Sequence, residues 1–284
     1  MNNKYKEYIK YTILILCSVI FAIFTYKVVA DKTIYIDSIV YNYISNNIIN
    51  KNRTEIVKVI TNITSPIMVI ITLLILVLAI KDKKIKISLV INLLGITIIN
   101  NLIKVIIARP RPEINKLVTE TGYSFPSGHS ITSMVFYGYL VYLTYKYINN
   151  KKIKIPLIIF LILLIPTIGL SRIYLGVHYA SDVLCGFLLG IIYLILFISI
   201  SKKYLDIASS HAIEAAILLL YLYTEKYLNK KDDDLYDKIK LLISRIENNP
   251  KYNESIKSII EDNLKKLKEN KHINITRERM VLWL

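Results

Sequence analysis

The chain has 284 residues, of which 54% are hydrophobic, and its mean hydropathy is +0.45. This composition is more apolar than that of an average soluble domain and indicates a membrane protein with a polar appendage. The formal net charge is +16, but Lys and Arg outnumber Asp and Glu by 21 to 8 in residues 1–201 and by only 16 to 13 in residues 202–284. The basic residues alternate with apolar runs and form no solvated stripe, which argues against nucleic-acid binding.

Six apolar stretches are each expected to cross a membrane as a helix, because about 20 apolar residues span the hydrocarbon core. They are residues 11–30, 66–80, 87–108, 131–147, 155–170 and 179–200. The mixed stretch 31–65 fits either one or two amphipathic helices at the interface or a long loop. Gly186 and Gly190 lie four residues apart in the last stretch and predict a close helix–helix contact.

Ionisable residues gather at the ends of these stretches, where polar groups are costly and usually functional. Lys104 and, seven residues later, Arg111-Pro112 close the third stretch; Pro126-Ser127-Gly128-His129 opens the fourth. Between the fifth and sixth stretches, Arg172 offers a planar fork suited to phosphate oxygens. His178 and Asp182 are four apart, so on a helix the carboxylate could orient the imidazole as a nucleophile. The same segment also fits a polar loop that caps a helix.

These three segments resemble the signatures K-x6-R-P, P-S-G-H and S-R-x5-H-x3-D of the type 2 phosphatidic acid phosphatase superfamily, in order and over about the first two hundred residues. The resemblance implies that His178 attacks phosphorus and forms a phospho-histidine, that Asp182 holds His178, and that His129 protonates the leaving group. It also implies that the phosphate is bound by Lys104, Arg111, Ser127, Gly128 and Arg172, with no metal and no cofactor.

Arg109 lies outside the signature positions and is expected to touch substrate or lipid headgroups, and Tyr179 is expected to be an interfacial aromatic residue. The expected activity is metal-independent hydrolysis of a lipid phosphomonoester or pyrophosphate, with phosphatidic acid, phosphatidylglycerol phosphate and polyprenyl pyrophosphates such as undecaprenyl pyrophosphate as candidates. The alternative is a membrane scaffold or transporter that binds phosphate lipids without turnover.

The orientation follows from the short loops, since Lys-rich loops face the cytoplasm. The N-terminus and the turns at 81–86 and 146–154 are Lys-rich. We therefore expect a plasma-membrane protein with cytoplasmic termini and with the three signatures on the extracytoplasmic face.

Residues 1–201 are expected to form the membrane domain, and residues 202–284 a small cytoplasmic domain of three helices. Residues 212–223 form an apolar run that is too short to span a membrane and is expected to be an amphipathic or core helix. Apolar residues recur at helical spacing in 234–248 and 253–271. This domain could mediate self-association or bind a protein partner; nothing in it suggests catalysis.

Overall fold

The computed structural model describes residues 3–113, 116–230, 233–247 and 254–269. Every regular element in these ranges is a helix, which confirms the predicted all-α class. The chain divides into two compact units, Met1–Ser201 and Lys202–Leu284.

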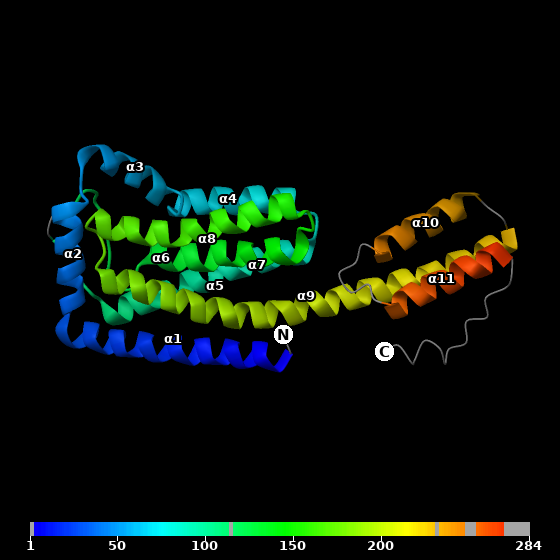
Figure 1. The fold of residues 1–284 in the computed structure, drawn as a ribbon, viewed down its shortest axis with the longest axis horizontal. Helices are drawn as coiled ribbons and strands as arrows, with labels where there is room; N and C mark the ends of the chain where they lie inside the picture. The colour runs from blue at the N-terminus through cyan, green and yellow to red at the C-terminus, as the bar shows by residue number, and fades with distance from the viewer. Residues whose placement is uncertain (1–2, 114–115, 231–232, 248–253, 270–284) are drawn as a thin grey trace. The chain divides into compact units, whose positions relative to one another are not determined.

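The first unit contains long helices that run side by side and short helices at one end (Figure 1). The elements are α1 (Asn3–Asp31), α2 (Tyr35–Asn47), α3 (Lys51–Asn62), α4 (Pro66–Ala79), α5 (Lys83–Ile107), α6 (Gly128–Thr132), the π-helical turn η1 (Ser133–Tyr137), α7 (Gly138–Tyr147), α8 (Lys151–Tyr174) and α9 (Ala180–Lys230).

Short polar residues start several of these helices by accepting otherwise unpaired backbone N–H groups. The Ser65 hydroxyl accepts from the amide of Met68, and Pro66 occupies the first turn of α4. Asp82 accepts from two amides at the start of α5, and Asn150 accepts from Lys152 at the start of α8. These caps explain why a turn of only a few residues separates α4 from α5 and α7 from α8.

Four helical segments are long and apolar enough to cross a membrane: Glu7–Asp31, Lys83–Ile107, Lys151–Tyr174 and Ala180–Lys202. The pair α3 and α4, bent by 47°, makes a fifth candidate if it acts as one span. The sequence predicted six. The expected fourth crossing, residues 131–147, is helical throughout but is divided by η1.

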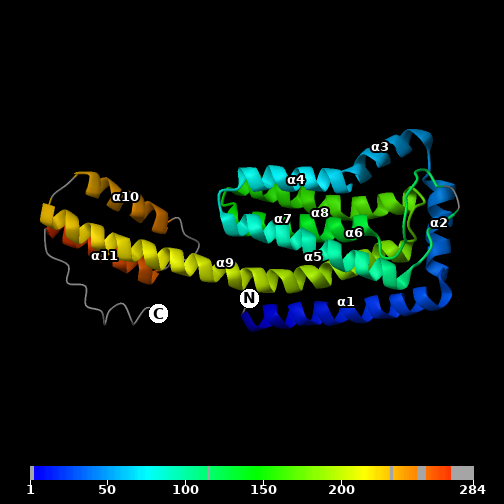
Figure 2. The same ribbon diagram turned by 180° about the vertical axis from the view of Figure 1, so that it is seen from behind.

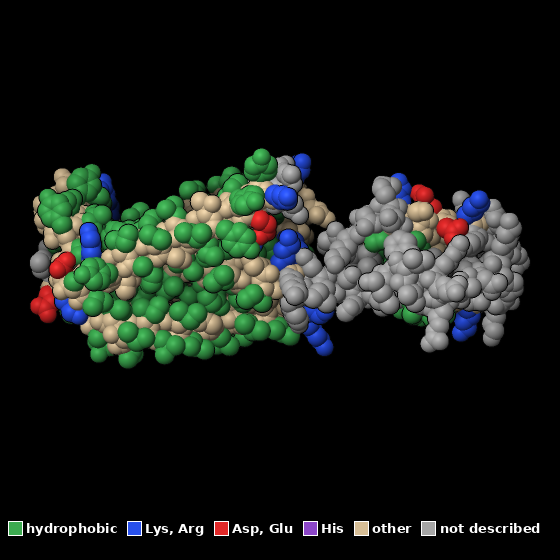
Figure 3. Space-filling model, turned by 90° about the horizontal axis from the view of Figure 1, so that it is seen from below, with side chains coloured by type: hydrophobic (Ala, Val, Ile, Leu, Met, Phe, Trp, Pro, Cys, Tyr) green, Lys and Arg blue, Asp and Glu red, His purple; other side chains and the backbone are tan. Residues whose placement is uncertain are grey.

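The Lys-rich turns and the signature segments lie at opposite ends of the helices (Figures 1 and 2). The start of α1, the α4–α5 turn and the α7–α8 turn share one end. The segments after α5 and after α8 share the other end with α2. The sides of the helices between the two ends carry mostly hydrophobic side chains (Figure 3), as a lipid-facing surface requires.

The stretch 31–65 is helical, so the loop alternative for it is wrong. It contains α2 and α3, and α2 carries a buried carboxylate, Asp37, which is 2% exposed. A charge is buried only with a partner, so this position signals an interaction that the sequence pattern did not show.

Small residues on α9 allow α6 to approach closely, as predicted. A Cβ atom added to Gly186 would lie 2.8 Å from the Ser130 Cβ and 3.0 Å from the Ser127 carbonyl oxygen. A Cβ atom added to Gly190 would lie 2.7 Å from the Met134 Cβ. The P-S-G-H segment is therefore packed directly on the helix that carries Asp182.

We predict that Gly186→Ala destabilises the protein by about 1–3 kcal/mol, because the added methyl group meets backbone at a distance that requires a shift. The measurement is the thermal unfolding midpoint in detergent, which should fall. Ser199→Ala, at an exposed position on the same helix, serves as the control and should leave the midpoint unchanged. Equal midpoints for Gly186→Ala and wild type would show that the two helices are not in close contact.

The second unit contains α10 (Asp233–Glu247) and α11 (Glu254–Glu269) beside the later part of α9. Its buried apolar cluster draws on all three: Leu220, Ile239, Ile246, Ile256 and Ile260. α11 falls within the predicted stretch 253–271, and α10 begins one residue before the predicted stretch 234–248. The stretch 212–223 is not a separate helix but part of α9.

Candidate active site

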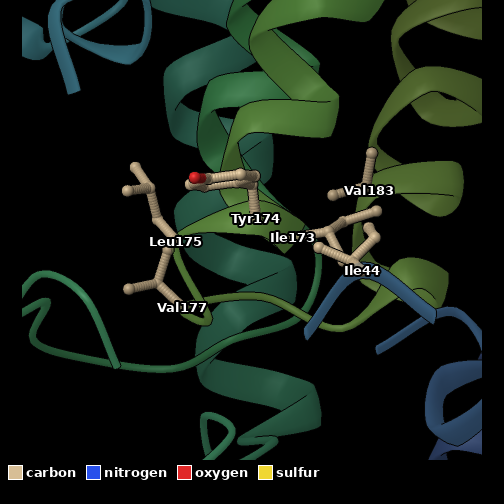
Figure 4. Close-up of a cluster of buried hydrophobic side chains, with 6 residues drawn as sticks. All are labelled: Ile44, Ile173, Tyr174, Leu175, Val177 and Val183. Atoms are coloured by element: carbon tan, nitrogen blue, oxygen red, sulfur yellow. The ribbon is translucent and has the colours of Figure 1, made fainter. Parts of the chain in front are cut away.

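Two loops form the site, residues 108–127 between α5 and α6 and residues 175–179 between α8 and α9. Backbone hydrogen bonds and a small apolar core hold them in place. The Leu117 amide donates to the Leu175 carbonyl (3.0 Å), and the Ser127 amide donates to the Asp182 carbonyl (3.1 Å). Around the second loop, a buried cluster packs together: Ile44, Ile173, Tyr174, Leu175, Val177 and Val183 (Figure 4). The cluster holds the chain immediately before His178 against α2 and α9.

His178 lies in the loop before α9, where its imidazole is buried and has a defined orientation. Its Nδ1 atom is 3.4 Å from the Asp182 Oδ2 atom, and its Nε2 atom is 3.1 Å from the Arg111 NH1 group. A guanidinium can only donate hydrogen bonds, so Nε2 accepts and the ring proton is on Nδ1. The unprotonated nitrogen therefore points towards a cation, as a nucleophile for an anionic substrate requires.

The predicted pair of His178 and Asp182 does meet, but not on one face of a helix. Asp182 lies in the first turn of α9, and its Oδ2 atom accepts from the backbone amide of Tyr179 at 2.9 Å. The Ser124 hydroxyl donates to the same carboxylate oxygen. Asp182 thus caps its own helix while it faces His178, so the capping interpretation of this segment is compatible with the catalytic one.

Three cations of the first and third signatures converge on four consecutive loop residues. Lys104, near the end of α5, donates to the Tyr123 carbonyl at 2.6 Å. Arg111 donates to the carbonyls of Gly122 (3.1 Å) and Thr121 (3.0 Å). Arg172, in the last turn of α8, pairs with the carboxylate of Glu120. The structure thus brings Lys104 and Arg111 together with Arg172, which lies about 60 residues further along the chain.

Arg172 is nearly completely buried, at 1% exposed, yet one of its donors has no partner. Its NH1 group donates to the Thr61 hydroxyl at 2.8 Å and its NH2 group to Glu120, but its Nε atom is buried without a hydrogen bond. A buried unpaired donor on a cation is costly, so this atom is a natural position for a phosphate oxygen.

The P-S-G-H segment forms the start of α6. The Ser127 hydroxyl is buried and accepts from the amide (3.4 Å) and the hydroxyl (2.9 Å) of Ser130. Ser127 is therefore the helix cap, a role that the sequence prediction of a hydroxyl donor to phosphate did not include. A Cβ atom on Gly128 would lie 3.3 Å from the Asn100 amide nitrogen, so Gly128 permits close packing against α5.

Both imidazoles are neutral near pH 7 in the substrate-free site. Burial lowers the pKa of His178 to about 4, with Asp182 opposing the shift and Arg111 and Lys104 adding to it. Burial, together with the charges of Arg172 and Arg111, lowers the pKa of His129 to about 2. These shared neighbours put His129 at the same cationic cluster as His178.

A cavity of about 270 Å³ reaches His178 from the side of α2. Its lining residues are Thr33, Asp37, Ser38, Tyr41, Asn42, Pro112, Glu113, Ile173, His178, Tyr179 and Ala180. The three cations do not line it. Lys104, Arg111 and Arg172 contact residues 120–123 of the loop. The cavity lies beside His178 and is lined by residues of α2 and by Pro112 and Glu113.

Two sequence expectations are wrong. Arg109 is 0% exposed and touches neither headgroup nor solvent; its guanidinium pairs with Asp37 at 2.7 Å and with Asp182 at 2.5 Å. Tyr179 is half-buried and its ring lies 3.9 Å from the Arg109 guanidinium carbon, so it is part of this cluster and not only an interfacial aromatic residue.

Sequence reasoning also missed Asp37, Glu120, Ser124 and Ser181. Asp37, Glu120 and Ser124 lie outside the three signatures, and Ser181 occupies an unspecified position of the third. Asp37 and Glu120 are isolated acidic residues in apolar or loop segments, and an unexplained charge beside a membrane stretch is the only signal that could have identified them.

Comparison with known proteins gives consistent matches. Residues 85–206 match the family model described as the PAP2 superfamily. The chain is 39% identical over 97 residues to phosphatidylglycerophosphatase B of Bacillus subtilis (strain 168), covering 34% of this chain and 47% of that protein. It is 27% identical over 143 residues to lipid phosphate phosphatase delta of Arabidopsis thaliana, covering 44% of this chain and 34% of that protein. The matched stretches span less than half the length of both relatives.

Another relative and a crystal structure extend the comparison. Bacitracin transport permease protein BcrC of Bacillus licheniformis is 38% identical over 82 residues, covering 28% of this chain and 36% of that protein. The crystal structure of a transmembrane PAP2 type phosphatidylglycerolphosphate phosphatase from Bacillus subtilis superimposes with a TM-score of 0.60 at 24% identity. It covers 67% of this chain and 96% of that chain, so the two share the fold.

We predict that Glu120→Gln strengthens the binding of inorganic phosphate by about twofold to fivefold. The carboxylate competes with phosphate for Arg172, and a half-exposed ion pair is worth up to about 1 kcal/mol. Calorimetric titration of the detergent-solubilised protein with phosphate measures the affinity. Glu113→Gln, an exposed change in the same connecting segment, is the matched control. Unchanged or weaker binding in Glu120→Gln would contradict competition between the carboxylate and phosphate.

We predict that His178 makes the protein less stable as the pH falls from 6.5 towards 4. The unfolded chain binds a proton at its ordinary pKa of about 6.5, whereas the folded site binds one only near 4. The free energy of unfolding should lose roughly 3 kcal/mol over this window from His178 alone.

The measurement for this prediction is the thermal midpoint between pH 7 and 4.5 for wild type and His178→Gln. The decline should be shallower in the variant, because its unfolded state no longer takes up that proton. Parallel curves would mean that His178 is not desolvated in the folded protein.

Proposed function

We propose that the protein is an integral membrane phosphatase that hydrolyses the phosphomonoester or pyrophosphate group of a lipid. The match of residues 85–206 to the model of the PAP2 superfamily supports this proposal. The observation that carries the proposal is the orientation of His178. Its unprotonated Nε2 atom faces Arg111 at 3.1 Å, and its protonated Nδ1 atom faces Asp182. A phosphate-binding protein has no need of an oriented nucleophile beside its cations.

In the first step, the Nε2 lone pair of His178 attacks phosphorus and the bond between phosphorus and the leaving oxygen breaks. Lys104, Arg111 and Arg172 balance the charge on the three equatorial oxygens. His129 donates its proton to the leaving alkoxide or lipid phosphate, and Asp182 stabilises the ring of His178 as it becomes cationic. The product of this step is a phospho-histidine.

In the second step, water attacks phosphorus on the phospho-histidine and the phosphorus–nitrogen bond breaks. His129, now neutral, accepts the proton of this water, and inorganic phosphate leaves. Burial and the neighbouring cations lower the pKa of His129. A phosphate dianion among Lys104, Arg111 and Arg172 offsets those cations and so favours protonated His129.

For membrane placement we propose six crossings, with residues 131–147 as the fourth. This stretch belongs to an uninterrupted helical run from Gly128 to Tyr147. Crossings four and five then return the P-S-G-H segment and His178 to one face. The Lys-rich turns at the other end of the helices support a cytoplasmic position for the termini, a plasma-membrane location and an extracytoplasmic site.

We propose phosphatidylglycerol phosphate, phosphatidic acid and polyprenyl pyrophosphate as the substrate set, on the basis of the names of the relatives and the position of the site at the end of apolar helices. We also propose that residues 202–284 form a cytoplasmic helical domain that mediates self-association or binds a protein partner. Its apolar cluster gives it a core of its own.

The proposal predicts that purified protein releases phosphate from at least one of these lipids in the presence of EDTA. His178→Ala should lower the rate by at least about a thousandfold, since the nucleophile cannot be replaced by its neighbours. His129→Ala should also lower the rate, because the leaving group then lacks its acid in the first step and the hydrolytic water lacks its base in the second.

Tyr123→Phe, an exposed aromatic change beside the site, is the control and should retain turnover. Unchanged release in His178→Ala would remove the assignment of the nucleophile. Tight phosphate-lipid binding with no release from any of the lipids would favour the scaffold or transporter alternative. Loss of activity on EDTA treatment, restored by a divalent ion, would contradict metal independence.

A further inference from the structure

Arg109 is completely buried at the site although it belongs to none of the three signatures. All three of its guanidinium nitrogens donate: Nε to the Lys32 carbonyl (2.6 Å), NH2 to Asp37 (2.7 Å), and NH1 to Asp182 (2.5 Å) and to the Ser181 hydroxyl (2.8 Å). The Tyr179 ring covers the group at 3.9 Å. No direction remains in which this cation could contact a substrate.

The two oxygens of Asp182 are divided between Arg109 and the nucleophile. Oδ1 accepts from Arg109, while Oδ2 faces the His178 Nδ1 atom and accepts from Ser124 and from the Tyr179 amide. A carboxylate is planar, so fixing Oδ1 also fixes the plane in which Oδ2 meets the imidazole. The Arg109 contact therefore determines how Asp182 presents itself to His178.

Asp37 holds Arg109 from the opposite side and is equally buried. Its Oδ2 atom accepts from Arg109 and from the Ser181 hydroxyl (2.9 Å), and its Oδ1 atom accepts from the Ser181 amide (2.8 Å). Two buried carboxylates, Asp37 and Asp182, thus share one guanidinium. Without that cation they would repel each other across Ser181, and breaking a buried pair in this way is strongly unfavourable.

We propose that Arg109 is a positioning residue for the reaction: with Asp37 as its counterion, it fixes the carboxylate of Asp182 and thereby keeps His178 in the tautomer that leaves Nε2 free. The inference rests on the proposed function for its kinetic consequence. Its structural consequence, the tautomer of His178, does not depend on turnover.

The kinetic test compares Arg109→Met, Asp182→Asn and the double variant with wild type on one lipid phosphate. Arg109→Met should lower kcat by about 10²–10³-fold, the size of effect expected when the group that orients a catalytic imidazole is lost. KM should change by less than about threefold, because Arg109 does not reach the phosphate. On the Asp182→Asn background, adding Arg109→Met should cost less than about threefold, since residues that act as one unit are not additive.

Arg109→Lys separates charge from geometry. It keeps the cation but cannot bond both carboxylates and the Lys32 carbonyl in one plane, so it should recover only part of kcat. Tyr174→Phe controls for general loosening: Tyr174 joins α8 to Asn50 and Thr54 at the same end of the bundle. This change should lower the thermal midpoint while leaving kcat within about twofold of wild type.

The second readout is ¹⁵N NMR of histidine-labelled protein, with the His178 signal assigned by its absence in His178→Gln. In wild type and Tyr174→Phe the proton should lie on Nδ1. In Arg109→Met, and in Asp182→Asn, a fraction should move to Nε2. An unchanged His178 signal in folded Arg109→Met, or multiplicative losses in the double variant, would overturn the proposal. If wild type released no phosphate, the proposed function would fail while the NMR result still decided the role of Arg109.

Discussion

The structure at this end of the bundle depends on one constraint: every charge that leaves water must find a partner. Arg109 meets it with two carboxylates and a carbonyl, Arg172 with Thr61 and Glu120, and Lys104 with the Tyr123 carbonyl. Because these partners belong to segments far apart in the sequence, satisfying the charges also joins α2, α3, α5, α8, α9 and the segment after α1 into one site. The buried cations that fix the loops through these contacts include the cations that could bind an anion.

The three cations are already paired with negative groups of the protein itself. Glu120 and the carbonyls of residues 121–123 provide negative partial and full charge where the account puts the phosphoryl oxygens. These negative groups reduce the repulsion among the three cations. Exchanging them for phosphate therefore costs less free energy than ordering solvated side chains around phosphate would. The unpaired Nε atom of Arg172 shows that the protein's own groups do not satisfy the cluster completely.

The sequence predicted the all-α class and most of the apolar helices, because each has a long hydrophobic run and a recognisable cap. It also identified the residues whose spacing belongs to the three signatures. It could not predict that α2 contributes Asp37, since a lone Asp in an amphipathic stretch has the same local pattern whether it faces solvent or a buried arginine. Arg109 was misjudged for a similar reason: two residues from Arg111, it looks like another phosphate ligand, and only the fold turns it inwards.

The central claim, that the Nε2 atom of His178 is the nucleophile of an anion site formed by Lys104, Arg111 and Arg172, is tested most directly by a crystal or cryo-electron microscopy structure with orthovanadate bound. The account predicts vanadium at covalent distance from His178 Nε2, its oxygens on the three cations, and Glu120 withdrawn from Arg172. Vanadate bound elsewhere, or on the Nδ1 side of the ring, would contradict it.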